Sequence, residues 1–138
     1  MPSPVFVSRL LAAVLLAMGA VAPAFAELSP IQQGAVTYIS GGVGDDEIAA
    51  MKSSIGAYNL LISNSEKDGS FTAGIDVVIR DGHGQAVLNA RNTGPLLYVK
   101  LPPGDYTLDA IYRGVENVRD ATIGSKRPTE INFIWPTV

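Results

Sequence analysis

LPPGDYTLDAIYRG, residues 101–114, is the stretch that decides the fold. Its two prolines fix φ and lack a backbone N–H, so they belong to a turn and not to a ladder. Gly104 tolerates backbone geometry that a side chain would penalise. After the turn, apolar and polar residues alternate, with Ile111 as the apolar exception, which is typical of a strand with one buried and one wet face. The side chains expected inside are Tyr106, Leu108, Ala110 and Tyr112, and those expected outside are Thr107, Asp109 and Arg113.

The segment before this turn, residues 95–101, is also predicted to be a strand. Leu97, Val99 and Leu101 share one parity in it. We therefore expect the two strands to form a β-hairpin closed by the Pro-Pro-Gly turn. Pro-Gly turns also occur in ligand-binding loops, and that alternative stays open at this point.

A short helix is predicted from Asp45 to about Ile55. Three acids at 45–47 suit the positive end of a helix dipole. Ile48, Met51 and Ile55 recur at intervals of three and four, which gives one apolar stripe. We expect this stripe to cover an edge or a face of a sheet. The three acids could also bind a cation, but a calcium site needs six to eight oxygens at suitable positions.

The remaining pattern predicts short strands at intervals of roughly ten residues, the rhythm of an antiparallel sandwich. The fold class expected is mainly β, a seven- or eight-stranded antiparallel β-sandwich with one short N-terminal helix. Residues 35–40 are expected to form the first strand, at an edge. The other strands are expected at residues 58–63, 71–80, 85–90, 115–123 and 129–135, with Ile131, Phe133 and Trp135 on one face of the last.

Residues 1–26 are predicted to be a cleavable signal peptide. Arg9 supplies a positive n-region, an uncharged apolar run follows, and Ala24-Phe25-Ala26 has the small-x-small pattern before the expected cleavage after Ala26. The apolar run is too short for a membrane anchor. Residues 27–34 are expected to be a flexible leader, and residues 35–138 a single sandwich domain. The chain has no cysteine, so a lipoprotein anchor is excluded, and the protein is expected to be periplasmic or secreted.

Four parts of the sequence resemble a known family. The Leu-Pro-Pro-Gly-x-Tyr-x-Leu-x-Ala-x-Tyr-x-Gly pattern at 101–114 is similar to the carboxypeptidase regulatory-like domain, a transthyretin-type β-sandwich. Residues 38–47, residues 94–97 and the closing Phe133-Ile134-Trp135-Pro136 resemble small secreted proteobacterial proteins that carry this one domain. The resemblance implies a fold and a secreted location, and no catalytic residue is transferred by it.

Charge and motifs exclude several functional classes. Without the signal, nine basic and thirteen acidic side chains remain, with no clustered basic face of the kind that nucleic-acid binders carry. His83 is the single histidine and lies in an Asp-Gly hairpin turn, where a solvated role is expected. No Gly-x-Ser-x-Gly elbow, thiol or zinc-ligand set is present. We expect no catalytic residue, no cofactor and no metal.

The sequence therefore predicts a non-enzymatic binding or structural module that contacts an unknown protein partner in the cell envelope through a sheet face or an edge strand. Tyr98 and Lys100 are the candidate contact surface, because they share the parity opposite to Leu97 and Val99. One alternative is a small-molecule or glycan binder that uses exposed aromatics. Another is a hydrolase of unrecognised type. No membrane span is expected after signal cleavage.

Overall fold

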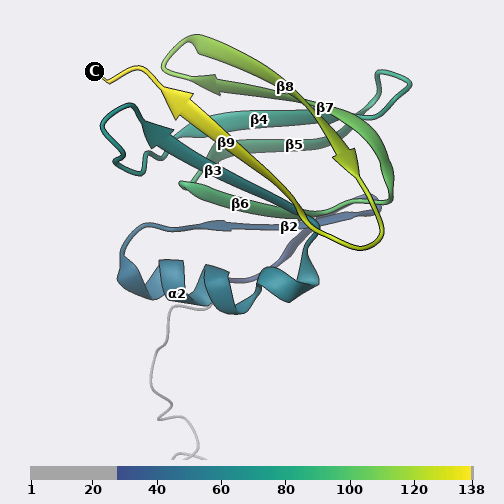
Figure 1. Cartoon of the computed structure of the whole chain (residues 1–138), viewed down its shortest axis with the longest axis horizontal. Coiled ribbons are helices and arrows are strands. Elements are labelled where there is room, and N and C mark those ends of the chain that lie inside the picture. Colours follow the sequence, from purple (N-terminus) through teal and green to yellow (C-terminus); the bar gives the residue numbers. More distant parts are fainter. Residues whose placement is uncertain (1–27, 138) are drawn as a thin grey trace, which may run out of the picture.

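The protein, described by a computed structural model over residues 28–137, is mainly β and consists of two facing sheets with one helix packed outside (Figure 1). The predicted signal segment, residues 1–26, lies outside the described residues. The strands are β1 (Ile31–Gln33), β2 (Val36–Gly41), β3 (Leu60–Glu66), β4 (Ile75–Arg80), β5 (Ala86–Thr93), β6 (Leu96–Lys100), β7 (Gly104–Tyr112), β8 (Val115–Ile123) and β9 (Thr129–Trp135). One sheet has the order β1-β2-β6-β3-β9 and the other the order β5-β4-β7-β8.

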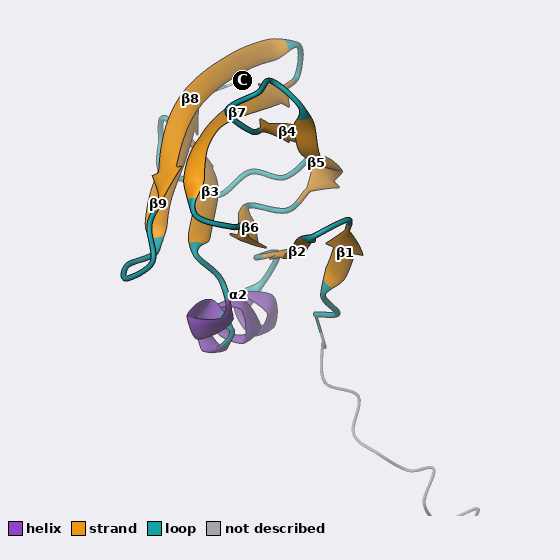
Figure 2. Ribbon diagram, turned by 90° about the vertical axis from the view of Figure 1, so that its right-hand side faces the viewer, coloured by secondary structure: helices purple, strands orange, loops and turns teal. Residues whose placement is uncertain are grey.

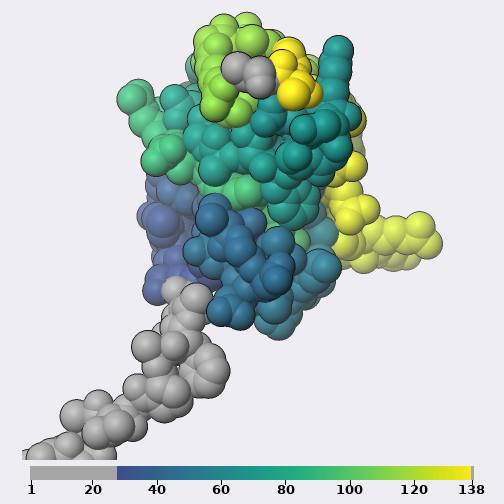
Figure 3. Space-filling model, turned by 90° about the vertical axis from the view of Figure 1, so that its left-hand side faces the viewer, coloured from purple at the N-terminus to yellow at the C-terminus, as the bar shows by residue number. Residues whose placement is uncertain are grey.

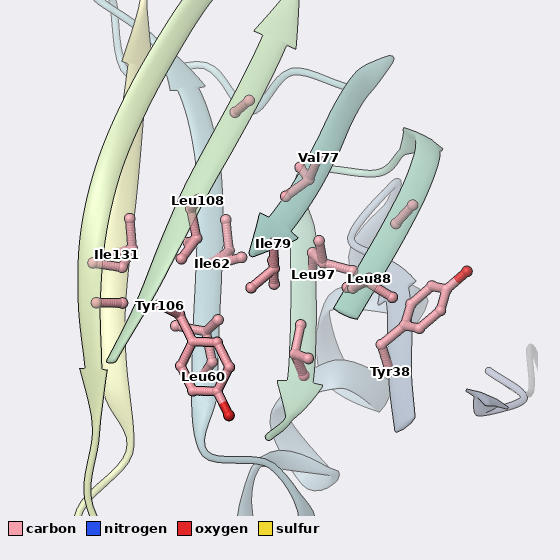
Figure 4. Packing of buried hydrophobic residues seen from close by; sticks show 14 of the residues in the cluster. Tyr38, Leu60, Ile62, Val77, Ile79, Leu88, Leu97, Tyr106, Leu108 and Ile131 are labelled. Carbon is pink, nitrogen blue, oxygen red and sulfur yellow. The ribbon is translucent and has the colours of Figure 1, made fainter. Parts of the chain in front are cut away.

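The inward faces of the two sheets supply one core. Figure 4 shows side chains such as Leu60, Leu97 and Ile79 filling the space between the strands. The alternation predicted for residues 104–112 is confirmed, since its four inward side chains are buried and Ile111 is 41% exposed. Ile131, Phe133 and Trp135 are likewise buried. Burial of a side chain such as Leu108 contributes about 2 kcal/mol relative to exposure.

The expected antiparallel pattern is wrong for one strand pair. β9 runs parallel to β3, with Leu60 opposite Thr129, while the other pairs are antiparallel. The strand expected over residues 71–80 begins only at Ile75, and Phe71 makes a single bridge to Ser65. Within residues 28–137 the strands number nine, not seven or eight.

The ninth strand is β1, which lies within the segment expected to be a flexible leader. Ile31 pairs with Tyr38, so β2 is not an edge strand. The side chain of Gln33 also holds the backbone of Asn89 on β5: its Nε2 donates to the Asn89 oxygen at 2.9 Å, and its Oε1 accepts from the Asn89 nitrogen at 3.0 Å. These partners are distant in sequence, so the three residues Ile31–Gln33 gave no local sign of a strand.

The hairpin expected across Pro-Pro-Gly is also wrong, because β6 and β7 belong to different sheets. The turn is a crossover between the layers. Its entry is held by Asn59, whose Nδ2 donates to the Leu101 oxygen at 2.7 Å and whose Oδ1 accepts from the Leu101 nitrogen at 2.8 Å. The Tyr106 hydroxyl donates to the Pro102 oxygen at 2.7 Å. Two prolines end a ladder in the same way before a hairpin and before a crossover, so the local sequence does not distinguish them.

Gly94 explains a second crossover, from β5 to β6. A Cβ on Gly94 would lie 2.5 Å from the carbonyl oxygen of Gly41, at the end of β2. Glycine is therefore required at this position by close approach of two backbones. The Gly94 nitrogen donates to the Ser40 hydroxyl at 2.7 Å, which fastens the crossover to β2.

The helix α2 (Asp45–Ser53) packs on the outer face of the five-stranded sheet, followed by the 3-10 turn η1 (Ile55–Ala57), as Figure 2 shows. The prediction that it covers a sheet is confirmed. Met51 is fully buried and shares a second apolar cluster with side chains of that outer face: Ile39, Leu61, Leu96 and Tyr98, together with Tyr58. Ile55, expected in the stripe, is 39% exposed because the α-helix ends before it.

Candidate functional site

Tyr98 does not lie on the surface, which contradicts its expected role as an exposed contact residue. Its side chain is 5% exposed and packs in the cluster beneath α2, with its ring centroid 6.3 Å from that of Tyr58. Burial, and then the charge of Glu130, raise the pKa of Tyr98. The parity assignment was correct, but α2 covers this part of the outer face, whereas Lys100, two residues further on, is exposed.

Lys100 lies at a groove at one end of the sandwich, which we call the end groove. Its hollow has a volume of about 560 Å³. One wall is formed by Ile55, Tyr58 and Pro102, and another by the loop of residues 124–128, which carries Lys126 and Arg127. This loop is the yellow-green projection at the right of Figure 3. The groove thus gathers three cations on an otherwise acidic chain.

The described residues offer no group of three histidine, cysteine or acidic side chains that could hold a metal ion. His83 is exposed in its turn, where its backbone N–H donates to Asp81 Oδ1 at 2.9 Å. Two carboxyl groups do meet, on the outer face of the four-stranded sheet: a side-chain hydrogen bond to Asp109, and then the charge of Asp109, raise the pKa of Glu116. Asp109 is half-buried and Glu116 is exposed, and no histidine or thiol accompanies the pair.

The aromatic side chains proposed for a glycan platform lie inside the molecule. Each of them is at most 8% exposed: Tyr58, Tyr98, Tyr106, Tyr112, Phe133 and Trp135. Rings in this position serve the core and not sugar stacking. Phe71 is 48% exposed, but it stands apart from the other rings in the hairpin-like segment after β3.

The outer edge of β8 is a further candidate, and sequence reasoning missed it. β8 is the last strand of its sheet and pairs with β7 in unbroken register over nine residues. The two-residue turn at Arg113 and Gly114, both with positive φ, closes the hairpin on Tyr112 and Val115. Such a turn closes on a hydrogen-bonded pair, so the backbone groups of Glu116, Val118 and Asp120 point away from β7.

Side chains along this edge combine apolar and acidic character. Val118 is 52% exposed and stands between Glu116 and Asp120 on the outer face. Ile111, opposite Glu116 on β7, is 41% exposed. We call Glu116, Val118 and Asp120 the acidic edge. The exposed valine amid alternating polar residues was visible in the sequence, but only the position of β8 at the end of a sheet makes it a binding edge.

The edges at β1 and β5 carry protection that the acidic edge lacks. β1 has only three residues, and short edges resist pairing. β5 has register shifts against β4 and is bridged by Gln33. The remaining half of β8 is held to β9 by Thr129, whose hydroxyl donates to the Thr122 oxygen at 2.7 Å. Arg119 Nη1 lies 3.5 Å from the Asn132 oxygen on β9.

A comparison of the chain with protein-family models and with curated proteins finds no match. The similarity to the carboxypeptidase regulatory-like domain therefore stays a prediction. Among residues 28–137, no helix is long and apolar enough to cross a membrane.

Proposed function

We propose that this protein is a non-enzymatic binding module of the bacterial cell envelope, and that it contacts a partner protein by adding one of the partner's strands to the acidic edge of β8. Export through the signal segment and membership of the carboxypeptidase regulatory-like family are parts of the same proposal. The observation that carries it is the regular, unpaired edge of β8 with Val118 exposed on it. Main-chain hydrogen bonds would supply affinity in this mode, and alternate side chains would supply specificity.

The chemistry of the edge indicates which strand would fit. An added strand places one side chain opposite each of Glu116, Val118 and Asp120 on the outer face. Opposite charges across strands are favourable by roughly 0.2–1 kcal/mol, and like charges directly opposite are unfavourable. The matching strand therefore carries an apolar side chain flanked by cationic ones at alternate positions.

The same rule disfavours a second copy of this chain as the partner. Antiparallel self-pairing centred on Val118 would set Glu116 of one copy opposite Asp120 of the other, and the same clash would recur at the symmetric position. The side-chain hydrogen bond to Asp109, and then repulsion between the two carboxylates, raise the pKa of Glu116. A cation from a partner strand would relieve that repulsion, whereas a third carboxylate would increase it.

Affinity capture from a periplasmic extract, with the wild-type chain and three variants as baits, tests the proposal. With the wild-type mature chain counted as the reference, the three variant baits are Val118→Pro, Val118→Lys and the control Val43→Lys. Proline at Val118 removes an N–H that points away from β7, so the β7–β8 ladder stays intact while strand addition is blocked. Val43 is 62% exposed and lies outside every strand, so it provides a matched lysine control.

The expected result is a protein retained by the wild type and Val43→Lys and lost with both Val118 variants. Circular dichroism of each bait shows that the fold is retained. Retention of the same proteins by Val118→Pro, or no protein above background on the wild type, contradicts strand addition at β8.

A further inference from the structure

The end groove is separate from the acidic edge and has the opposite charge. Lys100, Lys126 and Arg127 lie along it, which is three of the nine lysines and arginines in residues 28–137. Twelve acidic side chains are present in the same range, and none of them lines this groove. Within residues 28–137, the side-chain nitrogens of these three residues make no hydrogen bond or ion pair, so their charges are available to a ligand.

The base of the groove is rigid. The side chain of Asn59 is hydrogen-bonded to both backbone groups of Leu101, and the backbone oxygen of Asn59 accepts the Thr129 N–H at 2.8 Å. This one residue, which also lines the groove, therefore joins the start of β3, the end of β6 and the start of β9. Lys100 precedes Leu101, and Lys126 and Arg127 precede Thr129, so all three cations lie on segments that Asn59 joins.

The groove also has neutral and apolar surfaces beside the charges. Burial raises the pKa of Tyr58, so its hydroxyl stays protonated and can donate a hydrogen bond. Ile55 and three prolines, at 102, 103 and 128, supply apolar walls. The hollow of about 560 Å³ lies within the roughly 300–1,000 Å³ that is typical of small-molecule sites, and it exceeds what a lone oxyanion fills.

We propose that the end groove binds a small organic phosphate monoester. Three cations match a dianion, and the guanidinium of Arg127 suits bidentate contact with phosphate oxygens. The organic part would lie against Ile55 and the Pro102–Pro103 wall. The nearest carboxylate in sequence, Glu130, stands on β9 beyond the loop and does not line the groove. This assignment is independent of strand addition at β8.

Titration of the ¹⁵N-labelled mature protein with phenyl phosphate, followed by amide shifts, tests the proposal. Saturable shifts are expected at residue 100 and residues 124–128, with tighter binding for phenyl phosphate than for inorganic phosphate and no shifts with benzyl alcohol. Replacing each cation with glutamine (Lys100→Gln, Lys126→Gln, Arg127→Gln) is expected to weaken binding by up to about fivefold, the range for exposed ion pairs. The matched control is Lys67→Gln, because Lys67 lies in the turn after β3, at the other end of that strand from Asn59.

Two results would overturn the assignment: shifts spread over all the cations without saturation, or equal weakening by Lys67→Gln and the groove variants. A vesicle arm distinguishes the source of the phosphate. Groove-dependent binding to phosphatidic acid vesicles, but not to phosphatidylcholine vesicles, identifies a lipid headgroup as the natural monoester. Binding of phenyl phosphate without any binding to these vesicles identifies a soluble one.

Discussion

The hydrogen bond between Asn64 and Trp135 offers a sharp test of how the core is held together. Both side chains are fully buried, and Trp135 Nε1 donates to Asn64 Oδ1 at 3.0 Å. The Nδ2 of Asn64 has no partner. Removal of one member of such a pair leaves the other unsatisfied, at a cost of about 1–3 kcal/mol, whereas removal of both is close to neutral. The perturbations are Asn64→Leu, Trp135→Phe and the double variant.

Each single change is expected to destabilise the protein. Trp135→Phe loses about 1–2 kcal/mol of ring burial and also leaves the Asn64 amide unpaired, about 3 kcal/mol together. Asn64→Leu leaves the indole N–H of Trp135 without an acceptor but also removes the unpaired Nδ2. The free energy of unfolding is therefore expected to fall by about 1 kcal/mol. The double variant should lose less than the sum of the single changes by about 2 kcal/mol.

Urea denaturation measures these differences. Trp135 is the single tryptophan, so circular dichroism must replace tryptophan fluorescence as the probe. A matched control combines Asn64→Leu with Leu88→Ala, since Leu88 is a buried core residue that shares no hydrogen bond with Asn64, and this pair should be additive within about 0.5 kcal/mol. Strict additivity of the Asn64 and Trp135 changes would refute the coupling.

Three further outcomes are expected. Gly94→Ala should lower the free energy of unfolding by about 1–3 kcal/mol in a urea titration, because the new Cβ would lie 2.5 Å from the Gly41 oxygen; an unchanged midpoint would contradict this. Gln33→Ala should lower the free energy of unfolding by about 1 kcal/mol. It should also speed hydrogen exchange of the Asn89 N–H on β5, which donates to Gln33 Oε1, and unchanged protection of this N–H would rule out the bridge. Because the pKa of Glu116 is raised in the folded protein, protonated Glu116 stabilises the fold at pH values below its ordinary pKa of 4.5. This contribution is lost as the pH rises through the folded-state pKa. Glu116→Gln should therefore flatten the dependence of the urea midpoint on pH above 4.5, and a wild-type slope in the variant would disprove the link.

Alternation along single strands was readable because its cause is local. Each strand presents successive side chains to opposite faces, so residues 104–112 and 129–135 show in their order which side chains are buried. The helix from Asp45 was predicted for the same reason. These features depend on contacts within about ten residues.

The candidate sites depend on contacts between distant segments. The sequence showed that Tyr98 points away from the core, but α2 was needed to show that this face is covered there. Lys100 becomes part of a groove only because Asn59 draws the ends of β3, β6 and β9 together. Val118 becomes an edge residue only because β8 ends the order of its sheet.

The sequence by itself determined the class of fold, the inward and outward side chains of most strands, and the presence of a helix. Only the tertiary structure decided that Pro-Pro-Gly crosses between sheets, that β9 is parallel to β3, and that residues 31–33 form a strand. The physical reason is that side-chain alternation is a property of one strand, whereas sheet membership depends on which backbone groups pair across the chain, and the same local sequence permits more than one partner.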